Sequence, residues 1–225
     1  MNTEEILTTG KERVMNTYGR LPLALVKGQG TVVWDSDGKR YLDFVTGLAV
    51  TSLGHSHPEI VETIRQQAEQ ILHTSNLYWI PNQVKLAKLL TDHSFADRAF
   101  FCNSGAEANE GAIKLARKYA KKHFGSDKYK IVSLKNSFHG RTLAALTATG
   151  QQKYQEGYEP LPEGFSYIEI NNIEQLEEAI DAQTAAVMIE PIQGEGGVNL
   201  LTKEFVHRIK EVCVKHGALL IVDEV

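Results

Sequence analysis

The sequence contains little cysteine. Its 225 residues include only Cys102 and Cys213, and neither belongs to a C-x-x-C motif or to a cluster of cysteine and histidine. A disulfide framework or a zinc site would need several cysteines at characteristic spacings. The sequence therefore predicts no disulfide-bonded fold and no metal site, and it fits the reducing cytoplasm.

Long apolar runs and an excess of basic charge are also missing. Lysine and arginine number 24 against 28 aspartates and glutamates, a net charge of -4, whereas a nucleic-acid-binding surface is strongly basic. No apolar run approaches the roughly 20 residues that cross a bilayer. The acidic segment 1–5 has no basic stretch followed by an apolar one, so we expect no signal peptide. These absences argue against nucleic-acid, membrane and secreted classes.

What the chain does contain is a regular alternation of strand and helix patterns. We expect strands at 98–102, 129–134, 166–170, 185–190 and 218–223, and helices at 105–122, about 141–147, 173–180 and 202–215. The segments 185–189 and 218–222 are almost continuously apolar, which is typical of strands covered on both faces of a parallel sheet. The pattern predicts an α/β domain with a mainly parallel sheet and flanking helices.

The N-terminal part has a different pattern. Residues 1 to about 30 look irregular or partly helical, and 31–42 predict a hairpin around the turn Asp37-Gly38. A helix is expected to begin at Pro58, and another to run from about 82 to 90. We therefore predict a smaller N-terminal unit over 1–70 and a larger α/β unit over 71–225.

A short polar segment connects the expected strand 98–102 to the long helix after it. Ser104 and Glu107 have the spacing of a capping box, while Gly105 and Ala106 leave the first backbone N–H groups of the helix accessible. Such a helix end favours a bound phosphate. The alternative is a well-capped helix without a ligand. Neither the P-loop motif nor the dinucleotide-binding glycine motif is present.

The strand expected at 129–134 is followed by an aromatic residue and an arginine. Phe138 could stack on a flat ligand and Arg141 could bind a carboxylate with two hydrogen bonds. The alternative is a core phenylalanine and a surface salt bridge. We expect His139 to serve in packing or hydrogen bonding and assign it no part in the chemistry.

Carboxylates end the last two expected strands. Glu190 follows 185–189 and needs a partner, because an unpaired buried charge is costly. Glu195 lies in the glycine-rich loop after it and could pair reversibly with an arginine; a plain surface loop is the alternative. Asp223 directly follows the strand 218–222, where it would attract a cation or a protonated ring nitrogen. A structural aspartate or a metal ligand is the alternative there.

Four segments in this order resemble the class III aminotransferases, which are pyridoxal-phosphate enzymes of fold type I. They are Asn103-Ser104-Gly105-Ala106-Glu107-Ala108-Asn109-Glu110, Ser137-Phe138-His139-Gly140-Arg141-Thr142, Glu190-Pro191-Ile192-Gln193-Gly194-Glu195-Gly196-Gly197 and Asp223-Glu224-Val225. The resemblance extends from about residue 18 to 225 and is strongest to the acetylornithine-using branch. It implies the cofactor pyridoxal 5'-phosphate and transfer of the δ-amino group of N2-acetyl-L-ornithine to 2-oxoglutarate in arginine biosynthesis. A cytoplasmic homodimer is implied as well.

The resemblance also implies roles for single residues toward the cofactor. Ser104, Gly105 and Ala106 would bind its phosphate. Phe138 would stack on one face of its pyridine ring, and Val225 would pack against the other. The fold type implies that 71–225 belong to the large cofactor-binding domain and that 1–70 begin the small domain.

The remaining implied roles concern charge. Asp223 would pair with the ring nitrogen and keep it protonated, which makes it the catalytic residue of this chain. Arg141 would bind the substrate carboxylate, and Glu195 would be its movable partner or would contact the distal amine. Glu190 would support the site structurally.

One element of the family pattern is absent from this sequence. The family's Schiff-base lysine lies beyond the segment that corresponds to Asp223, and neither Lys130 nor Lys135 lies in a motif for it. We therefore expect a truncated fragment of a longer enzyme that is inactive alone. Two other functions stay open: another ω-aminotransferase, acting on ornithine, succinylornithine or 4-aminobutyrate, and a non-catalytic phosphate-binding protein if the natural chain ends at Val225.

Overall fold

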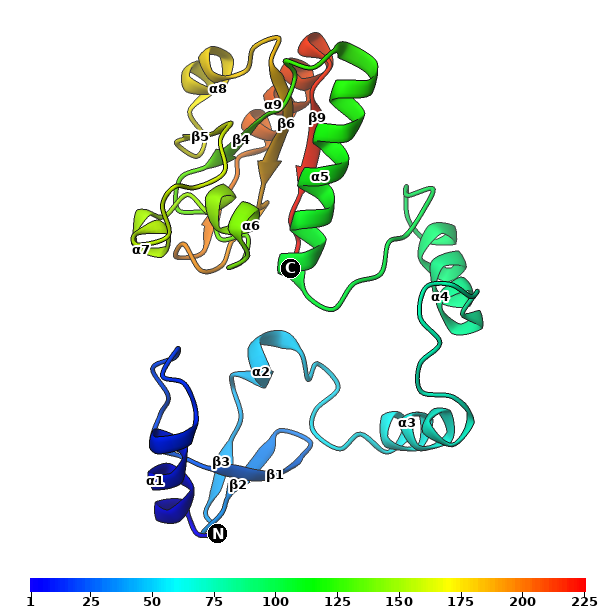
Figure 1. Cartoon of the computed structure of the whole chain (residues 1–225), viewed down its shortest axis with the longest axis vertical. Coiled ribbons are helices and arrows are strands. Elements are labelled where there is room, and N and C mark those ends of the chain that lie inside the picture. Colours follow the sequence, from blue (N-terminus) through cyan, green and yellow to red (C-terminus); the bar gives the residue numbers. More distant parts are fainter. The chain divides into compact units, whose positions relative to one another are not determined.

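The computed structural model describes all 225 residues and divides into two compact units, Met1–Val84 and Lys85–Val225. Figure 1 labels the elements of both units. No helix is both long enough and apolar enough to span a bilayer. The expected boundary near residue 70 stays a prediction.

The first unit combines helices with a small antiparallel sheet of order β1-β2-β3. Its elements are α1 (Thr3–Arg13), β1 (Leu25–Gln29), β2 (Val32–Asp35), β3 (Arg40–Leu42), α2 (Thr46–Ala49) and α3 (Pro58–Gln70). The predicted hairpin is confirmed, because β2 pairs with β3 and Gly38 adopts a φ of 84° in the turn. Asp35 holds the turn by accepting hydrogen bonds from the Lys39 N–H and the Tyr41 hydroxyl. The strand β1 was not predicted.

The second unit contains a parallel sheet of order β5-β4-β6-β9 between helices. The helix α4 (Pro81–Asp92) leads into it. The other elements are α5 (Gly105–Phe124), β4 (Lys130–Leu134), α6 (Leu143–Ala148), α7 (Gln152–Gln155), β5 (Phe165–Ile168), α8 (Ile173–Ala179), β6 (Thr184–Ile189), β7 (Ile192–Gln193), β8 (Asn199–Leu200), α9 (Lys203–His216) and β9 (Leu219–Val222). The predicted mainly parallel α/β architecture is confirmed.

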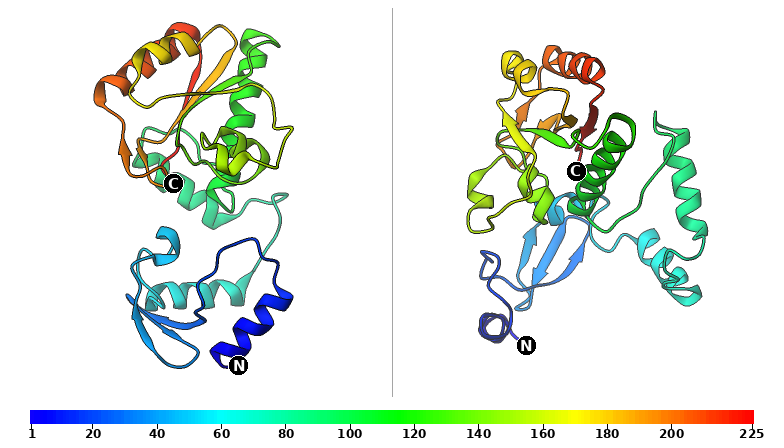
Figure 2. Two further views of the ribbon diagram at one scale, coloured as in Figure 1. Left: turned by 90° about the vertical axis from the view of Figure 1, so that its left-hand side faces the viewer. Right: turned by 45° about the horizontal axis from the view of Figure 1, so that its top comes forward.

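The two faces of this sheet are buried by different helices, since successive strand residues point to opposite sides. Val187 and Ile189 of β6 pack with Phe205 and Ile209 of α9, whereas Met188 packs with the residues of α5. In Figure 2 the orange-red α9 and the green α5 lie on opposite faces of the sheet. This double coverage explains why β6 reads as a continuous apolar run and not as an alternating one.

The expected strand at 98–102 is wrong. These residues carry no strand assignment, and Phe100 is 75% exposed. An apolar run becomes a strand only beside another strand that accepts its hydrogen bonds. None of the sheet's strands pairs with this segment.

The sheet brings the polar segments of the sequence to one edge. Leu134 pairs with Ile168, and Ile189 pairs with Val222, so the carboxyl ends of the strands are aligned. The chain order reverses between β4 and β6, because β5 is added on one side of β4 and β6 and β9 on the other. Ligands of open α/β sheets bind beyond the carboxyl ends of strands at such a switch point.

Candidate functional site

The first turn of α5 has backbone N–H groups that the chain leaves free. Ser104 is the N-cap, and its hydroxyl accepts a hydrogen bond of 3.2 Å from the Glu107 N–H. The Glu107 carboxylate accepts from the backbone and side-chain N–H groups of Asn103, not from the Ser104 N–H that the capping box would use. The N–H groups of Gly105 and Ala106 have no partner. They form an electropositive site for an anion.

Two other loops reach this turn. A Cβ on Gly105 would lie 3.0 Å from the side chain of Val225, which follows β9. Gly140, which follows β4 and has a φ of 128°, would carry a Cβ only 2.7 Å from that of Ala106. Glycine is required at position 140 on both grounds. The segments 104–106, 137–141 and 223–225, far apart in sequence, therefore lie at one place.

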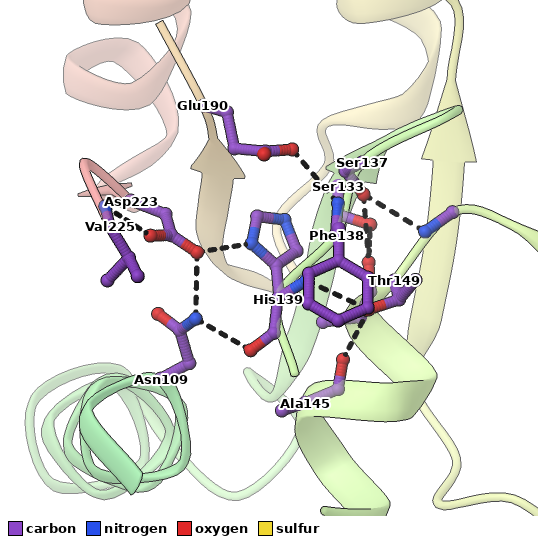
Figure 3. A network of polar contacts seen from close by, with 12 residues as sticks. Asn109, Ser133, Ser137, Phe138, His139, Ala145, Thr149, Glu190, Asp223 and Val225 are labelled. Atoms are coloured by element: carbon purple, nitrogen blue, oxygen red, sulfur yellow. Dashed lines mark hydrogen bonds and ion pairs between the residues drawn. The ribbon is translucent and has the colours of Figure 1, made fainter. Parts of the chain in front are cut away.

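Asp223 is the centre of a buried polar network (Figure 3). Its backbone N–H donates to the Ile189 carbonyl at 2.8 Å, which aligns it with the end of β6. Its Oδ2 accepts hydrogen bonds of 2.8 Å each from Asn109 Nδ2 and His139 Nδ1, and its Oδ1 accepts from the Val225 N–H at 3.1 Å. The carboxylate is therefore held by donors from three segments.

These donors decide the charge of Asp223. Burial alone would raise the pKa of its carboxyl, but the hydrogen bonds from His139, the Val225 N–H and Asn109 outweigh burial. The pKa of Asp223 lies below its ordinary value as a result. A buried, ionised carboxylate therefore faces the same region as the free helix end.

The helix α5 connects the two features directly. Gly105, in the first turn, and Asn109, which binds Asp223, are separated by about 6 Å along the helix axis at about 1.5 Å per residue. The structure thus brings the anion site and Asp223 to one location.

Phe138 and Glu190 lie beside this network. Phe138 is half-buried, and its ring meets that of Tyr154 edge-on at a centroid distance of 5.5 Å. Its backbone N–H donates to Glu190 Oε2 at 3.0 Å. Burial raises the pKa of the Glu190 carboxyl, and this one hydrogen bond offsets the effect only in part. Glu190 therefore anchors the 137–141 loop through the Phe138 N–H, but its ionised carboxylate lowers the stability of the folded state.

We expect Glu190→Gln to stabilise the protein at neutral and alkaline pH but not in acid. The folded-state pKa of Glu190 is raised, so below the unfolded-state pKa of about 4.3 both states are protonated and ionisation costs nothing. As the pH rises through the folded-state pKa, the wild-type protein loses stability relative to the variant. Urea unfolding from pH 4 to 8 measures the difference. Glu178→Gln, at an exposed site, is the control, and a pH-independent difference for Glu190→Gln would refute the argument.

Comparison with known proteins identifies the family of this chain. The family description "Aminotransferase class-III" matches residues 14–225. The chain belongs to the class III aminotransferases. It is 55% identical over 220 residues to the acetylornithine aminotransferase of Caldanaerobacter subterraneus subsp. tengcongensis, covering 98% of this chain and 56% of that protein. It is 52% identical over 225 residues to that of Methanocaldococcus jannaschii, covering 100% of this chain and 56% of the relative.

Solved structures agree with this assignment. The ornithine aminotransferase of Toxoplasma gondii matches with a TM-score of 0.91 at 33% identity, covering 99% of this chain and 53% of that chain. The acetylornithine aminotransferase of Elizabethkingia anophelis matches with a TM-score of 0.82 at 33% identity, covering 100% of this chain and 54% of that chain. The neighbours confirm the predicted fold type. The chain spans about half the length of the relatives that it matches.

In this class III aminotransferase, the two residues expected to contact substrate are both exposed. The guanidinium carbon of Arg141 lies 5.1 Å from the Tyr154 ring centroid, and Arg141 forms no ion pair. Glu195 likewise has no ion-pair partner, so the structure does not bring these two side chains together. Its neighbour Gly196 packs so closely that a Cβ there would lie 2.3 Å from the Asn136 carbonyl oxygen. The two loops that carry Arg141 and Glu195 are therefore in contact.

The sequence assigns no role to Asn109 and predicts packing or hydrogen bonding for His139. In the structure both residues donate hydrogen bonds to Asp223, so the hydrogen-bonding role of His139 is confirmed and Asn109 is an addition to the candidate site. One signal for Asn109 was present: it is a polar, weak helix former on the apolar side of α5, where Ile113 and Ala116 follow at helical spacing. His139 had no such signal, because its partner lies 84 residues away in the sequence.

Proposed function

We propose that the complete protein is a pyridoxal-phosphate-dependent aminotransferase. It transfers the δ-amino group of N2-acetyl-L-ornithine to 2-oxoglutarate in arginine biosynthesis and acts in the cytoplasm. The observation that carries the proposal is the convergence of the free N–H groups of Gly105 and Ala106 with the buried Asp223 carboxylate. The names of the curated relatives support the choice of donor.

The residues at the free helix end fit the phosphate of pyridoxal phosphate. The N–H groups of Gly105 and Ala106 would donate to its oxygens, with the Ser104 backbone and hydroxyl beside them. Gly105 has no Cβ, and one at this position would lie 3.0 Å from the Val225 side chain. The free N–H groups therefore match a phosphate in donor chemistry, and the missing Cβ leaves the first turn uncrowded.

The residues at the other end fit a protonated pyridine nitrogen. Asp223 is ionised and buried, so it would hold a proton on that nitrogen at neutral pH. Phe138 and Val225 would pack on the two ring faces. Bound there, the cofactor supplies an electron sink for the negative charge that develops on the substrate carbon next to the transferred nitrogen.

Substrate binding rests on the two exposed charged residues. Arg141 carries an unpaired guanidinium and would hold a substrate carboxylate with two hydrogen bonds. Glu195, on the adjacent glycine-rich loop, would be the movable partner of Arg141, pairing with it or contacting the distal amine of the donor. We propose that the complete protein works as a homodimer.

A second ω-amino donor, ornithine, is the main alternative. Its support is the high structural similarity to the ornithine aminotransferase of Toxoplasma gondii. The curated relatives at higher identity carry the acetylornithine name, which favours the acetylated donor.

Steady-state rates of the complete gene product with pyridoxal phosphate and 2-oxoglutarate decide between these functions. We expect kcat/KM for N2-acetyl-L-ornithine to exceed that for ornithine by about tenfold or more, because a binding pocket that fits the acetyl group discriminates to that extent. Equal or better use of ornithine would reject the choice of donor. Phosphate binding without turnover of any amino donor would instead favour a non-catalytic protein.

A further inference from the structure

The Asn109 side chain forms two buried hydrogen bonds that leave it no freedom. It is 6% exposed, and its Nδ2 donates to the His139 carbonyl and to Asp223 Oδ2, at 2.8 Å each (Figure 3). A primary amide has two N–H donors, so both are used. Asparagine is a weaker helix former than leucine or alanine, and helix stability does not explain it at this position of α5.

Asn109 also touches both members of the histidine–aspartate pair. His139 Nδ1 lies 2.8 Å from the same Asp223 Oδ2, while His139 Nε2 is buried without a partner. The histidine ring is therefore anchored only at Nδ1 and through its backbone. The backbone N–H of His139 donates to Thr149 Oγ1 at 2.9 Å, and the backbone carbonyl of His139 accepts from Asn109. Loss of the Asn109 amide would loosen both the Asp223 carboxylate and the His139 backbone.

The same amide joins Asp223 to the helix that begins at the anion site. Asp223 follows β9, and Gly105 and Ala106 open α5, so no covalent path of fewer than 100 residues connects them. Asn109 makes the only side-chain hydrogen bond from α5 to Asp223. The α-helix is a stiff spacer with a fixed rise per residue.

We propose that Asn109 is a positioning residue that sets the distance between the phosphate-binding turn and the carboxylate that binds the ring nitrogen. The inference rests on the proposed function, because it concerns the same cofactor site. A structural role alone would predict lower stability with no preference for one end of the ligand. A positioning role predicts a defect that appears only when a ligand spans both ends.

The test compares two probes on the cofactor-free form of the complete enzyme, wild type and Asn109→Leu. Leucine has a similar size and no donor. We expect the Kd of pyridoxal 5'-phosphate to rise about tenfold or more, since a hydrogen bond to a charged group is lost and Asp223 is released. The Kd of inorganic phosphate, which needs only the helix end, should stay within about twofold of the wild-type value. Calorimetry measures both constants.

Ile113→Ala is the matched control, because Ile113 is one turn further along the same buried side of α5 and has no polar group that could bond to Asp223. It should lower the melting temperature and leave the ratio of the two Kd values unchanged. Asn109→Ala replaces the leucine variant if that variant does not fold. The positioning role is overturned if the Asn109 variants bind pyridoxal phosphate as tightly as the wild type, if both Kd values rise together, or if neither variant folds. If the wild type does not bind pyridoxal phosphate, the proposed function itself fails.

Discussion

Replacing Asp223 by asparagine in the complete enzyme is expected to lower kcat about a thousandfold. The substitution keeps the shape but removes the negative charge that would hold a proton on the ring nitrogen. Two charges about 4 Å apart in a protein interact by about 4 kcal/mol, and each 1.4 kcal/mol of transition-state stabilisation corresponds to about a tenfold rate. Asparagine also places an N–H group against the donors Asn109 and His139. Single-turnover and steady-state rates measure the loss.

Asp181→Asn is the matched control for this experiment. Asp181 precedes β6 at the opposite edge of the sheet, and its Oδ2 accepts a hydrogen bond of 2.9 Å from Lys130 Nζ. An exposed ion pair contributes about 0–1 kcal/mol to stability, so this variant should keep its kcat within about twofold. A kcat for Asp223→Asn above about a tenth of wild type would show that the ring nitrogen does not depend on this carboxylate.

Replacing Arg141 by alanine is expected to lower kcat/KM by about 30-fold to several thousandfold for both substrates. Removal of one partner from a desolvated pair of charges costs about 2–5 kcal/mol, because the substrate carboxylate is left without its counter-charge. Lysine at this position should recover only part of the activity, since it lacks the planar pair of donors. Initial rates over a range of each substrate separate kcat from KM.

Arg208→Ala is the control for the arginine variant. Arg208 lies on α9, which covers the opposite face of the sheet from α5, and donates to Glu177 and Glu211. Its removal takes away one exposed cation and leaves kcat/KM unchanged. If Arg141→Ala turns over both substrates normally, another cation binds the carboxylates and the assignment of Arg141 is wrong.

The order and type of the elements in the larger unit were predictable from local patterns. The near-continuous apolar segments before Glu190 and Asp223 predicted strands that are buried on both faces. The central strand β6 is buried throughout, whereas β9 is a strand at the edge of the sheet, where Leu220 and Val222 are 38% and 45% exposed. Ser104 predicted the start of α5 because a hydroxyl at the N-cap satisfies a backbone N–H of the first turn. The segment 98–102 shows the limit of this reasoning. Its apolar pattern is that of a strand, but strand formation depends on a neighbour that local sequence does not reveal.

Local sequence patterns were enough to predict which chemical groups the loops carry: a free helix N-terminus, an aromatic ring, an arginine and a carboxylate. They did not reveal that Asn109 and His139 converge on Asp223, or that Gly140 and Val225 lie against the first turn of α5, which the folded chain establishes. These contacts could not be predicted because they join segments tens of residues apart. They depend on strand order and register in the sheet, which no local propensity encodes.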